Sequence, residues 1–305
     1  MNRTILNVLA VPAFVALWQI ATSPLLFAEE IKVLSDQVLT GFQLPESIGC
    51  TADGKSMYVS QWGSELKPVE KDGKGKISRL SMDGKVVDDQ FLPLPGSTLD
   101  KPKGIWVEGD RLWIADIDTA WVVDLKTRKS KKFVVPESQF LNDVVVVGES
   151  LYISDTVADR VFKIEPADFL NSESDPKSTT AASSPGMSPN GVYPGKDGSL
   201  LVAGFNLNAP DQGALYSVSP KGEVKSLSQK FGQLDSMYQM KDGTILSTDW
   251  KTGSLFSWTE KDGLKILASN FKGPADLCAF ADDKGLMVIV PDLIKSEVRL
   301  IQLAQ

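Results

Sequence analysis

A short phrase of sequence recurs six times along this chain of 305 residues, and the recurrence limits the fold more than any other feature. Each copy runs from a polar residue through a small or apolar stretch to a tight turn, and then into a strand of alternating apolar residues. The acidic residues that mark the six turns are Asp53, Asp110, Glu149, Asp197, Asp242 and Asp283. They are separated by 57, 39, 48, 45 and 41 residues, which is the size of a β-propeller blade.

Each repeat predicts four antiparallel strands. Asp53-Gly54, Asp197-Gly198 and Asp242-Gly243 each stand between two apolar runs, and such a pair favours a hairpin because glycine readily adopts positive φ. The third strands are expected at Lys76–Leu80, Ala120–Asp124, Arg160–Ile164, Ala214–Val218, Ser254–Trp258 and Glu297–Leu303. A second turn then leads into an outer strand. The chain is therefore expected to be all-β, a six-bladed β-propeller of four-stranded antiparallel blades.

The last repeat ends one strand short, and the missing strand is found at the other end of the chain. Residues 31–36, followed by residues 42–46, match the outer strand at residues 224–229 and the segment 231–235 that follows it. An N-terminal strand is therefore expected to complete the last blade. This closes the ring and leaves no exposed sheet edge.

Two segments depart from the repeats. Residues 1–28 resemble an export signal, because Arg3 precedes an apolar run and the small residue Ala28 precedes two acids. Cleavage would leave a single propeller domain at residues 29–305, located in a periplasm or secreted; an uncleaved membrane anchor is the alternative. Residues 171–188 are rich in Ser, Thr, Ala and Pro, and they are predicted to form a surface loop.

Composition excludes several classes of function. The formal charge of −7 argues against binding to nucleic acid or to anionic membranes, so membrane contact is expected only through an uncleaved N-terminal segment. The chain contains no histidine, which excludes Ser–His and Cys–His dyads and the usual zinc sites. Catalysis would therefore depend on carboxylates, lysine, hydroxyl groups or a hard metal ion.

One position of the repeat, seven residues before each turn acid and called the slot below, carries polar side chains throughout. The slot residues are Glu46, Lys103, Asn142, Asn190, Asp235 and Asp276. Innermost strands of a propeller converge on its axis, so these residues are expected to face a shared funnel. Glu46, Asn142, Asn190 and Asp235 would supply oxygen donors from four blades, with Asp276 as a candidate fifth. Calcium takes six to eight oxygen ligands and suits such a set.

A purely structural interpretation of the slot is also open. Asn and Asp before a strand commonly accept backbone hydrogen bonds in turns. Lys103 could neutralise part of the acidic ring without any metal. Four aligned oxygen donors favour the metal site, because hard cations are held by such cages.

The two cysteines follow slots in the first and last repeats, which are neighbours in a closed ring. Cys50 and Cys278 are therefore a disulfide candidate in an exported protein. Two separate buried thiols are the alternative, because free cysteine is among the most buried residue types.

Other conspicuous residues are assigned to structure. The recurring tryptophans are expected to pack in the core or between blades; they are Trp62, Trp106, Trp113, Trp121, Trp250 and Trp258. The basic run at residues 126–132 is expected to be a solvated outer edge that discourages pairing.

The motifs Leu-Asn142-Asp143-Val, Pro-Asn190-Gly-Val, Leu-Asp235-Ser-Met and Pro-Glu46 resemble those of the gluconolactonase/regucalcin and paraoxonase group of six-bladed propellers. The resemblance implies that Glu46, Asn142, Asn190 and Asp235 hold a catalytic calcium ion. It also implies that Asp143, with Asp276 as a further candidate, belongs to a second or structural metal site deeper in the tunnel. Phe140 stands where sugar-lactone hydrolases of the group carry an arginine, and the histidine dyad of paraoxonases is missing.

The resemblance implies a hydrolase of lactones or small esters, in which a divalent metal, calcium in the first instance, polarises the carbonyl group. Asp235 would be both a ligand and the general base for the attacking water. The partner would be a small-molecule substrate, whose identity is set by loops that the slot does not specify. Lys103, Phe140 and the missing histidine favour the main alternative, a non-catalytic binding or scaffold propeller with a structural ion. A strictosidine-synthase-like enzyme, which shares the architecture without this metal, is a third possibility.

Overall fold

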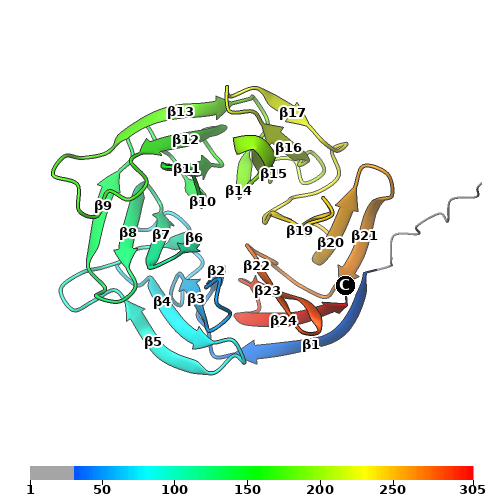
Figure 1. Cartoon of the computed structure of the whole chain (residues 1–305), viewed down its shortest axis with the longest axis horizontal. Coiled ribbons are helices and arrows are strands. Elements are labelled where there is room, and N and C mark those ends of the chain that lie inside the picture. Colours follow the sequence, from blue (N-terminus) through cyan, green and yellow to red (C-terminus); the bar gives the residue numbers. More distant parts are fainter. Residues whose placement is uncertain (1–30, 305) are drawn as a thin grey trace, which may run out of the picture. The chain divides into compact units, whose positions relative to one another are not determined.

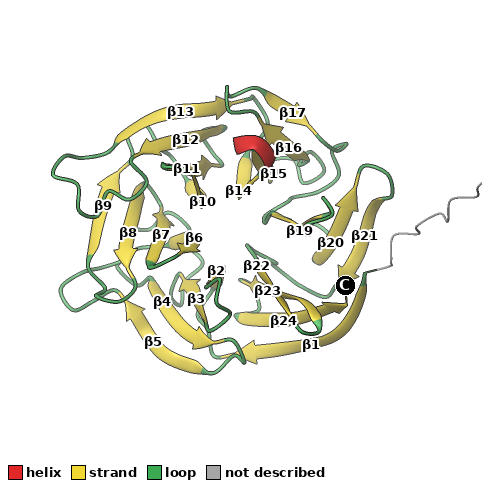
Figure 2. Ribbon diagram, viewed as in Figure 1, coloured by secondary structure: helices red, strands yellow, loops and turns green. Residues whose placement is uncertain are grey.

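The computed structural model describes residues 31–304, which form a ring of six antiparallel sheets with four strands each (Figure 1). This confirms the all-β, six-bladed propeller. Between these residues the one helical element is a 3₁₀ turn, η1 (Lys196–Gly198), so strands and loops make up nearly the whole ring (Figure 2). No helix in residues 31–304 is long and apolar enough to cross a membrane. The predicted export signal at residues 1–28 lies outside the described residues.

The first three blades follow the chain without interruption, and each runs from the axis outward. Blade 1 contains β2 (Pro45–Cys50), β3 (Ser56–Gln61), β4 (Lys76–Ser81) and β5 (Val86–Leu92). Blade 2 contains β6 (Pro102–Glu108), β7 (Arg111–Asp116), β8 (Thr119–Asp124) and β9 (Ser130–Val134). Blade 3 contains β10 (Leu141–Val147), β11 (Ser150–Asp155), β12 (Arg160–Glu165) and β13 (Lys177–Ser183).

The remaining blades repeat this order, and the last one takes its outer strand from the N-terminal end. Blade 4 contains β14 (Pro189–Pro194), β15 (Leu200–Gly204), β16 (Leu215–Val218) and β17 (Val224–Ser226). Blade 5 contains β18 (Tyr238–Gln239), β19 (Ile245–Asp249), β20 (Ser254–Thr259) and β21 (Gly263–Ala268). Blade 6 contains β22 (Cys278–Asp282), β23 (Gly285–Asp292), β24 (Glu297–Ala304) and β1 (Lys32–Thr40).

Two features join the first and last blades. Strand β1 pairs antiparallel with β24, from Lys32 opposite Ala304 to Thr40 opposite Glu297, as the sequence predicts. Cys50 of β2 and Cys278 of β22 form a disulfide bond, with Cα atoms 6.0 Å apart. The ring is therefore closed by a shared sheet on its outside and by a covalent link near its axis.

The predicted surface loop at residues 171–188 is wrong in its middle part, because β13 (Lys177–Ser183) is the outer strand of blade 3 and pairs with β12. Along β13 only Ala182 is buried. An outer strand with one neighbour and a solvated face needs no alternation of apolar residues. Its small polar sequence therefore gives no signal of the strand.

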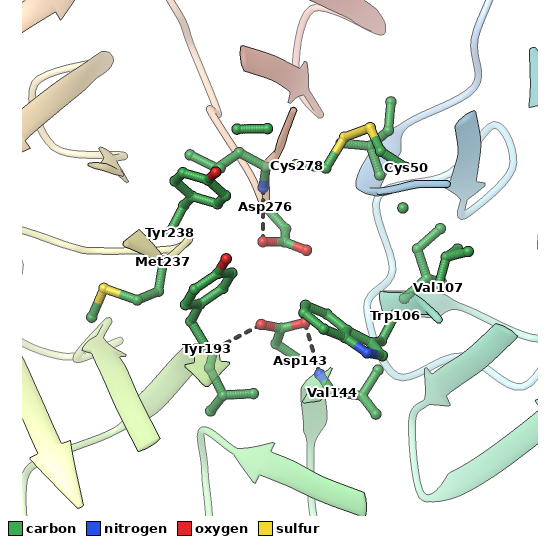
Figure 3. Close-up of a pocket in the computed structure, with 16 residues that line it drawn as sticks. Cys50, Trp106, Val107, Asp143, Val144, Tyr193, Met237, Tyr238, Asp276 and Cys278 are labelled. Carbon is green, nitrogen blue, oxygen red and sulfur yellow. Dashed lines mark hydrogen bonds between the residues drawn. A yellow bond between two sulfur atoms is a disulfide. The ribbon is translucent and has the colours of Figure 1, made fainter. Parts of the chain in front are cut away.

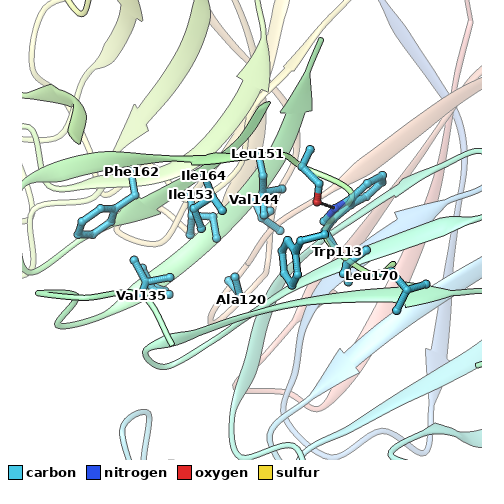
Figure 4. Packing of buried hydrophobic residues seen from close by; sticks show 14 residues of the cluster. Trp113, Ala120, Val135, Val144, Leu151, Ile153, Phe162, Ile164 and Leu170 are labelled. Atoms are coloured by element: carbon cyan, nitrogen blue, oxygen red, sulfur yellow. Dashed lines mark hydrogen bonds between the residues drawn. The ribbon is translucent and has the colours of Figure 1, made fainter. Parts of the chain in front are cut away.

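Apolar residues fill the space between neighbouring blades. In the largest of these clusters, Trp113 of blade 2 packs with Val144, Ile153 and Phe162 of blade 3 (Figure 4). The Trp113 indole N–H donates to the Ala167 carbonyl oxygen at 2.9 Å, so this buried polar group is satisfied. Each blade thus buries one face against the next, which holds the innermost strands around a common axis.

Candidate functional site

All six slot residues are buried near the axis of the ring. Each lies at the start of the innermost strand of its blade or just before it. Glycine follows two of them, where inner strands of adjacent blades approach closely. A Cβ atom added at Gly191 would fall well inside contact distance of the Asp235 carbonyl oxygen, and one at Gly104 would collide with Asp143. Glycine is therefore required at position 191 by the close approach of the neighbouring backbone, whereas Asn190 is the residue that faces the funnel.

Acidic side chains at the ends of second strands hold the segments that carry the slot residues. The Asp116 carboxylate accepts hydrogen bonds from the backbone N–H groups of Asp100 and Lys101, at 2.9 and 2.7 Å. Asp155 does the same for Gln139 and Phe140, at 2.6 and 3.1 Å. In blade 6, the Asp292 carboxylate binds the N–H groups of residues 272 and 273. These repeated contacts fix where each slot residue enters the funnel.

Four slot residues line one cavity of about 410 Å³, namely Glu46, Asn142, Asn190 and Asp235. Asn142 Nδ2 donates to Thr156 Oγ1 at 3.2 Å, and Asn190 Nδ2 donates to Asp235 Oδ2 at 3.3 Å. Both amide nitrogens are thus engaged, which leaves the amide oxygens as acceptors. The structure brings these four residues together from four different blades.

Three buried oxygen atoms in this group have no hydrogen-bond partner: Glu46 Oε2, Asn190 Oδ1 and Asp235 Oδ1. An unsatisfied buried polar group costs about 1–3 kcal/mol, so a ligand or water that paired these oxygens, and the unpaired indole N–H groups of Trp62 and Trp250 at the same cavity, would stabilise the fold. Among residues 31–304, no group of three or more Asp, Glu, His or Cys side chains is arranged to hold a metal ion. A cation here would therefore depend on a mixed set of carboxylates and amides, which fits calcium better than zinc or copper.

Burial and repulsion between neighbouring acids raise the pKa values of these carboxyl groups. Burial raises the pKa of Glu46 well above its usual range, and the charge of Asp235 raises it further. Burial likewise raises the pKa of Asp235, with Asp276 as the second cause. A bound cation would lower the pKa values of both Glu46 and Asp235.

Lys103 forms no direct ion pair with the slot acids, but its charge lowers the pKa of Glu46 and so offsets part of the effect of burial. Its Nζ atom donates to the Pro68 carbonyl oxygen at 3.0 Å and lies 4.4 Å from the centroid of the Phe140 ring. None of the ion pairs within the described part of the chain involves Lys103. Burial lowers the pKa of Lys103 to about 8. Its ammonium group thus anchors the loop between β3 and β4 and is covered by Phe140.

Asp143 and Asp276 do not join the other acids but line a second cavity of about 110 Å³, further along the innermost strands (Figure 3). Asp276 lies one residue past the register of the other slots, because Pro274 pairs with Asp292 as Pro189 pairs with Gly204, yet its charge still raises the pKa of Glu46 and Asp235. Burial raises the pKa of Asp143 well above its usual range, with Asp276 as the next cause. Burial also raises the pKa of Asp276 to about 7.

Trp62 and Trp250 pack with Ala275 and Leu293, as the sequence predicts, and both also line the large cavity. The residue that directly follows the second strand of a blade lines this cavity in five of the six blades. These residues are Trp62, Thr156, Phe205, Trp250 and Leu293. The sequence could have identified these residues, because each one directly follows the second strand of its blade. Together with Phe140 they give the cavity a largely apolar wall.

The raised pKa values predict how pH acts on metal-free protein. The folded protein holds a proton on Asp276 up to about pH 7, whereas the unfolded chain releases it near pH 4. The free energy of unfolding should therefore fall as pH rises between about 4 and 7, and Glu46, Asp143 and Asp235 act in the same direction. The lowered pKa of Lys103, about 8, has the opposite effect, at higher pH.

Thermal unfolding in the presence of a chelator, measured from pH 4.5 to 7.5, tests this expectation. Asp276→Asn is the matched control, and it should show a smaller fall in melting temperature over that range. Stability of the wild-type protein that rises across the same range, or a variant with an unchanged slope, would contradict the assignment.

No protein-family model matches the chain, and no curated protein matches it at a significant level. Solved structures do resemble it. A streptogramin B lyase is 14% identical, covering 88% of this chain and 97% of that one, with a TM-score of 0.56. Virginiamycin B lyase from Staphylococcus aureus is 14% identical over 90% of this chain and 99% of that one, with a TM-score of 0.59.

A chain of a nidogen/laminin complex is also similar, at 14% identity over 89% of this chain and 99% of that one, with a TM-score of 0.54. Enzymes and a protein taken from a complex with another protein therefore have this architecture. The likenesses support the propeller architecture, while the six blades are given by the sheets themselves.

Proposed function

We propose that the protein is a calcium-dependent hydrolase of lactones or small esters, with its reaction centre at Glu46, Asn142, Asn190 and Asp235. The observation that carries this proposal is the set of three unpaired buried oxygens on Glu46, Asn190 and Asp235, directly beside a cavity of about 410 Å³. Two carboxylates and two amide oxygens from four blades would hold the ion. When bound, calcium supplies a positive charge that polarises a carbonyl group.

The side chains around the centre have distinct roles in this proposal. Asp235 accepts the proton of the attacking water, because it is the carboxylate with an unpaired oxygen and a neighbouring amide to orient it. Asn190 holds the other Asp235 oxygen through its Nδ2 atom. Trp62, Phe205 and Trp250 exclude water from the cavity and provide apolar contact for the substrate.

The similarity to virginiamycin B lyase supports an enzymatic use of this fold without supplying the reaction. An inactive variant of that lyase has a histidine replaced by alanine. The present chain contains no histidine, so we do not extend the lyase activity to it.

Calorimetric titration of calcium into the chelator-treated protein is the experiment that tests the proposal. We expect saturable binding that is lost in the Glu46→Ala, Asp235→Ala double variant, followed by hydrolysis in a screen of lactones and esters. Folded protein that binds no calcium would overturn the proposal.

Saturable calcium binding with no hydrolysis of any lactone or ester would instead favour a binding or scaffold propeller with a structural ion. The location of Lys103 favours this second function, because the buried ammonium group lies beside Phe140 at the wall of the cavity. Its charge would disfavour a second cation close by.

A further inference from the structure

The second cavity is enclosed by aromatic rings at one position of the repeat. Trp106, Tyr193 and Tyr238 each lie three residues after a slot, on β6, β14 and β18. The Trp106 and Tyr193 rings are 6.1 Å apart and nearly perpendicular, and the Tyr193 and Tyr238 rings are 5.2 Å apart. All three side chains are half-buried. They form a partial cage around the cavity (Figure 3).

Two carboxylates point into the same cavity. Asp143 accepts hydrogen bonds from the backbone N–H groups of Val144 and Val192, both at 2.7 Å. Asp276 accepts from the Leu277 N–H at 2.7 Å and from Ser47 Oγ at 2.6 Å. All four donors are neutral. Both acids are more than nine-tenths buried, and none of the residues lining the cavity is Lys or Arg.

The chemistry of this wall selects among cations. Calcium needs six to eight oxygen ligands, whereas here three aromatic side chains take up much of the wall and only two acids contribute carboxylate oxygens. An alkylated ammonium ion is attracted to the faces of Trp and Tyr rings and needs no complete shell of oxygens. Two buried acids at the base of an aromatic cage, which a bound cation would help to ionise, therefore favour an organic cation.

We propose that the cavity lined by Trp106, Tyr193, Tyr238, Asp143 and Asp276 is a binding site for a small alkylated ammonium compound. The site is separate from the proposed reaction centre and does not depend on hydrolase activity. Its volume of about 110 Å³ suits a trimethylammonium group. The rings contact its methyl groups, and one ionised carboxylate, of Asp143 or Asp276, balances its single charge.

Calorimetry with choline, and with 3,3-dimethylbutanol as its neutral isostere, tests the proposal on the wild-type protein. We expect choline to bind with a dissociation constant of about 1 mM or tighter and the isostere to bind at least about tenfold more weakly, since the charge gives the affinity. Equal binding of the two compounds, or binding of neither, would overturn the proposal. This comparison needs no variant and hence does not depend on folding of an altered chain.

Variants then locate the site. Trp106→Leu and Tyr193→Leu should each weaken choline binding by about 3- to 30-fold, the range expected for loss of one cation–π contact. Tyr152→Leu, which removes a half-buried tyrosine outside the cavity, is the matched control and should bind choline as the wild type does. Undiminished binding by both cage variants would overturn the assignment.

Two further titrations identify the source of the cation. Calcium that displaces choline completely from the Asp235→Ala variant would show that an inorganic ion takes the cavity, and it would overturn the proposal. Binding to phosphatidylcholine vesicles without binding of free choline would also overturn it, in favour of a lipid headgroup. Binding of free choline that calcium does not displace supports it.

Discussion

Replacing Asp235 with alanine is expected to abolish hydrolysis while leaving the propeller folded. The substitution removes a proposed calcium ligand and the proposed general base together. General-base catalysis alone contributes about 10²- to 10⁴-fold, so kcat/KM for a lactone or ester substrate should fall by at least that factor. Calorimetry on the same variant should show weakened or absent calcium binding.

The matched control is Asp283→Ala, which removes an exposed acid at a turn of blade 6 and should leave both activity and calcium affinity unchanged. Circular dichroism and melting temperature check that the Asp235 variant is folded. If this variant retained the wild-type rate, Asp235 would be neither the base nor a required ligand.

Removing the disulfide should produce the largest loss of stability. Cys50 and Cys278 are 228 residues apart in the sequence, so the bond restricts the unfolded chain over most of its length. The double variant Cys50→Ser, Cys278→Ser should lower the free energy of unfolding by about 2–5 kcal/mol. Unfolding in guanidinium chloride at fixed pH and calcium concentration measures the difference.

A reducing agent provides the control for this experiment. It should lower the stability of the wild-type protein by a similar amount and leave the double variant unaffected. Equal midpoints for oxidised wild-type protein and the variant would show that the shared sheet of β1 and β24 closes the ring on its own.

The sequence was sufficient for most of the fold, because the signals that define a blade are local. Turns such as Asp53-Gly54 and Asp242-Gly243 mark the hairpins, and the apolar residues after them mark the second strands. Strand β13 was missed because its place at the outer edge requires pairing only with β12, and its residues bury almost nothing. Outer strands are specified by their neighbour more than by their own composition.

The candidate site was accessible from sequence only in part. Counting back from the turn acids predicted that Glu46, Asn142, Asn190 and Asp235 lie together. In a propeller, residues at the same position of each repeat lie at the same level around the axis. The depth of Asp276 relative to Asp235 was not accessible in this way. In blade 6 Pro274 pairs with Asp292, as Pro189 pairs with Gly204 in blade 4, so Ala275 takes the place of Asn190 and Asp276 lies one residue further along.

Lys103 shows a second limit of the sequence. Its charge suggested a partner among the slot acids, whereas its ammonium group reaches a backbone carbonyl in the loop that follows β3. That loop belongs to another blade, and no spacing within the repeat specifies its path. Contacts between loops of different blades follow only from the folded ring.

The pairing of β1 with β24 also orders events during synthesis. Strand β1 leaves the ribosome at the beginning, and its partner, Glu297–Ala304, is made more than 250 residues later. Blades 1 to 5 can form one after another as the chain lengthens, but during that time β1 has no neighbour in its own sheet. Completion of the ring therefore waits until β24 has been made, and until then β1 is an unpaired edge that chaperones, proteases and other chains can reach.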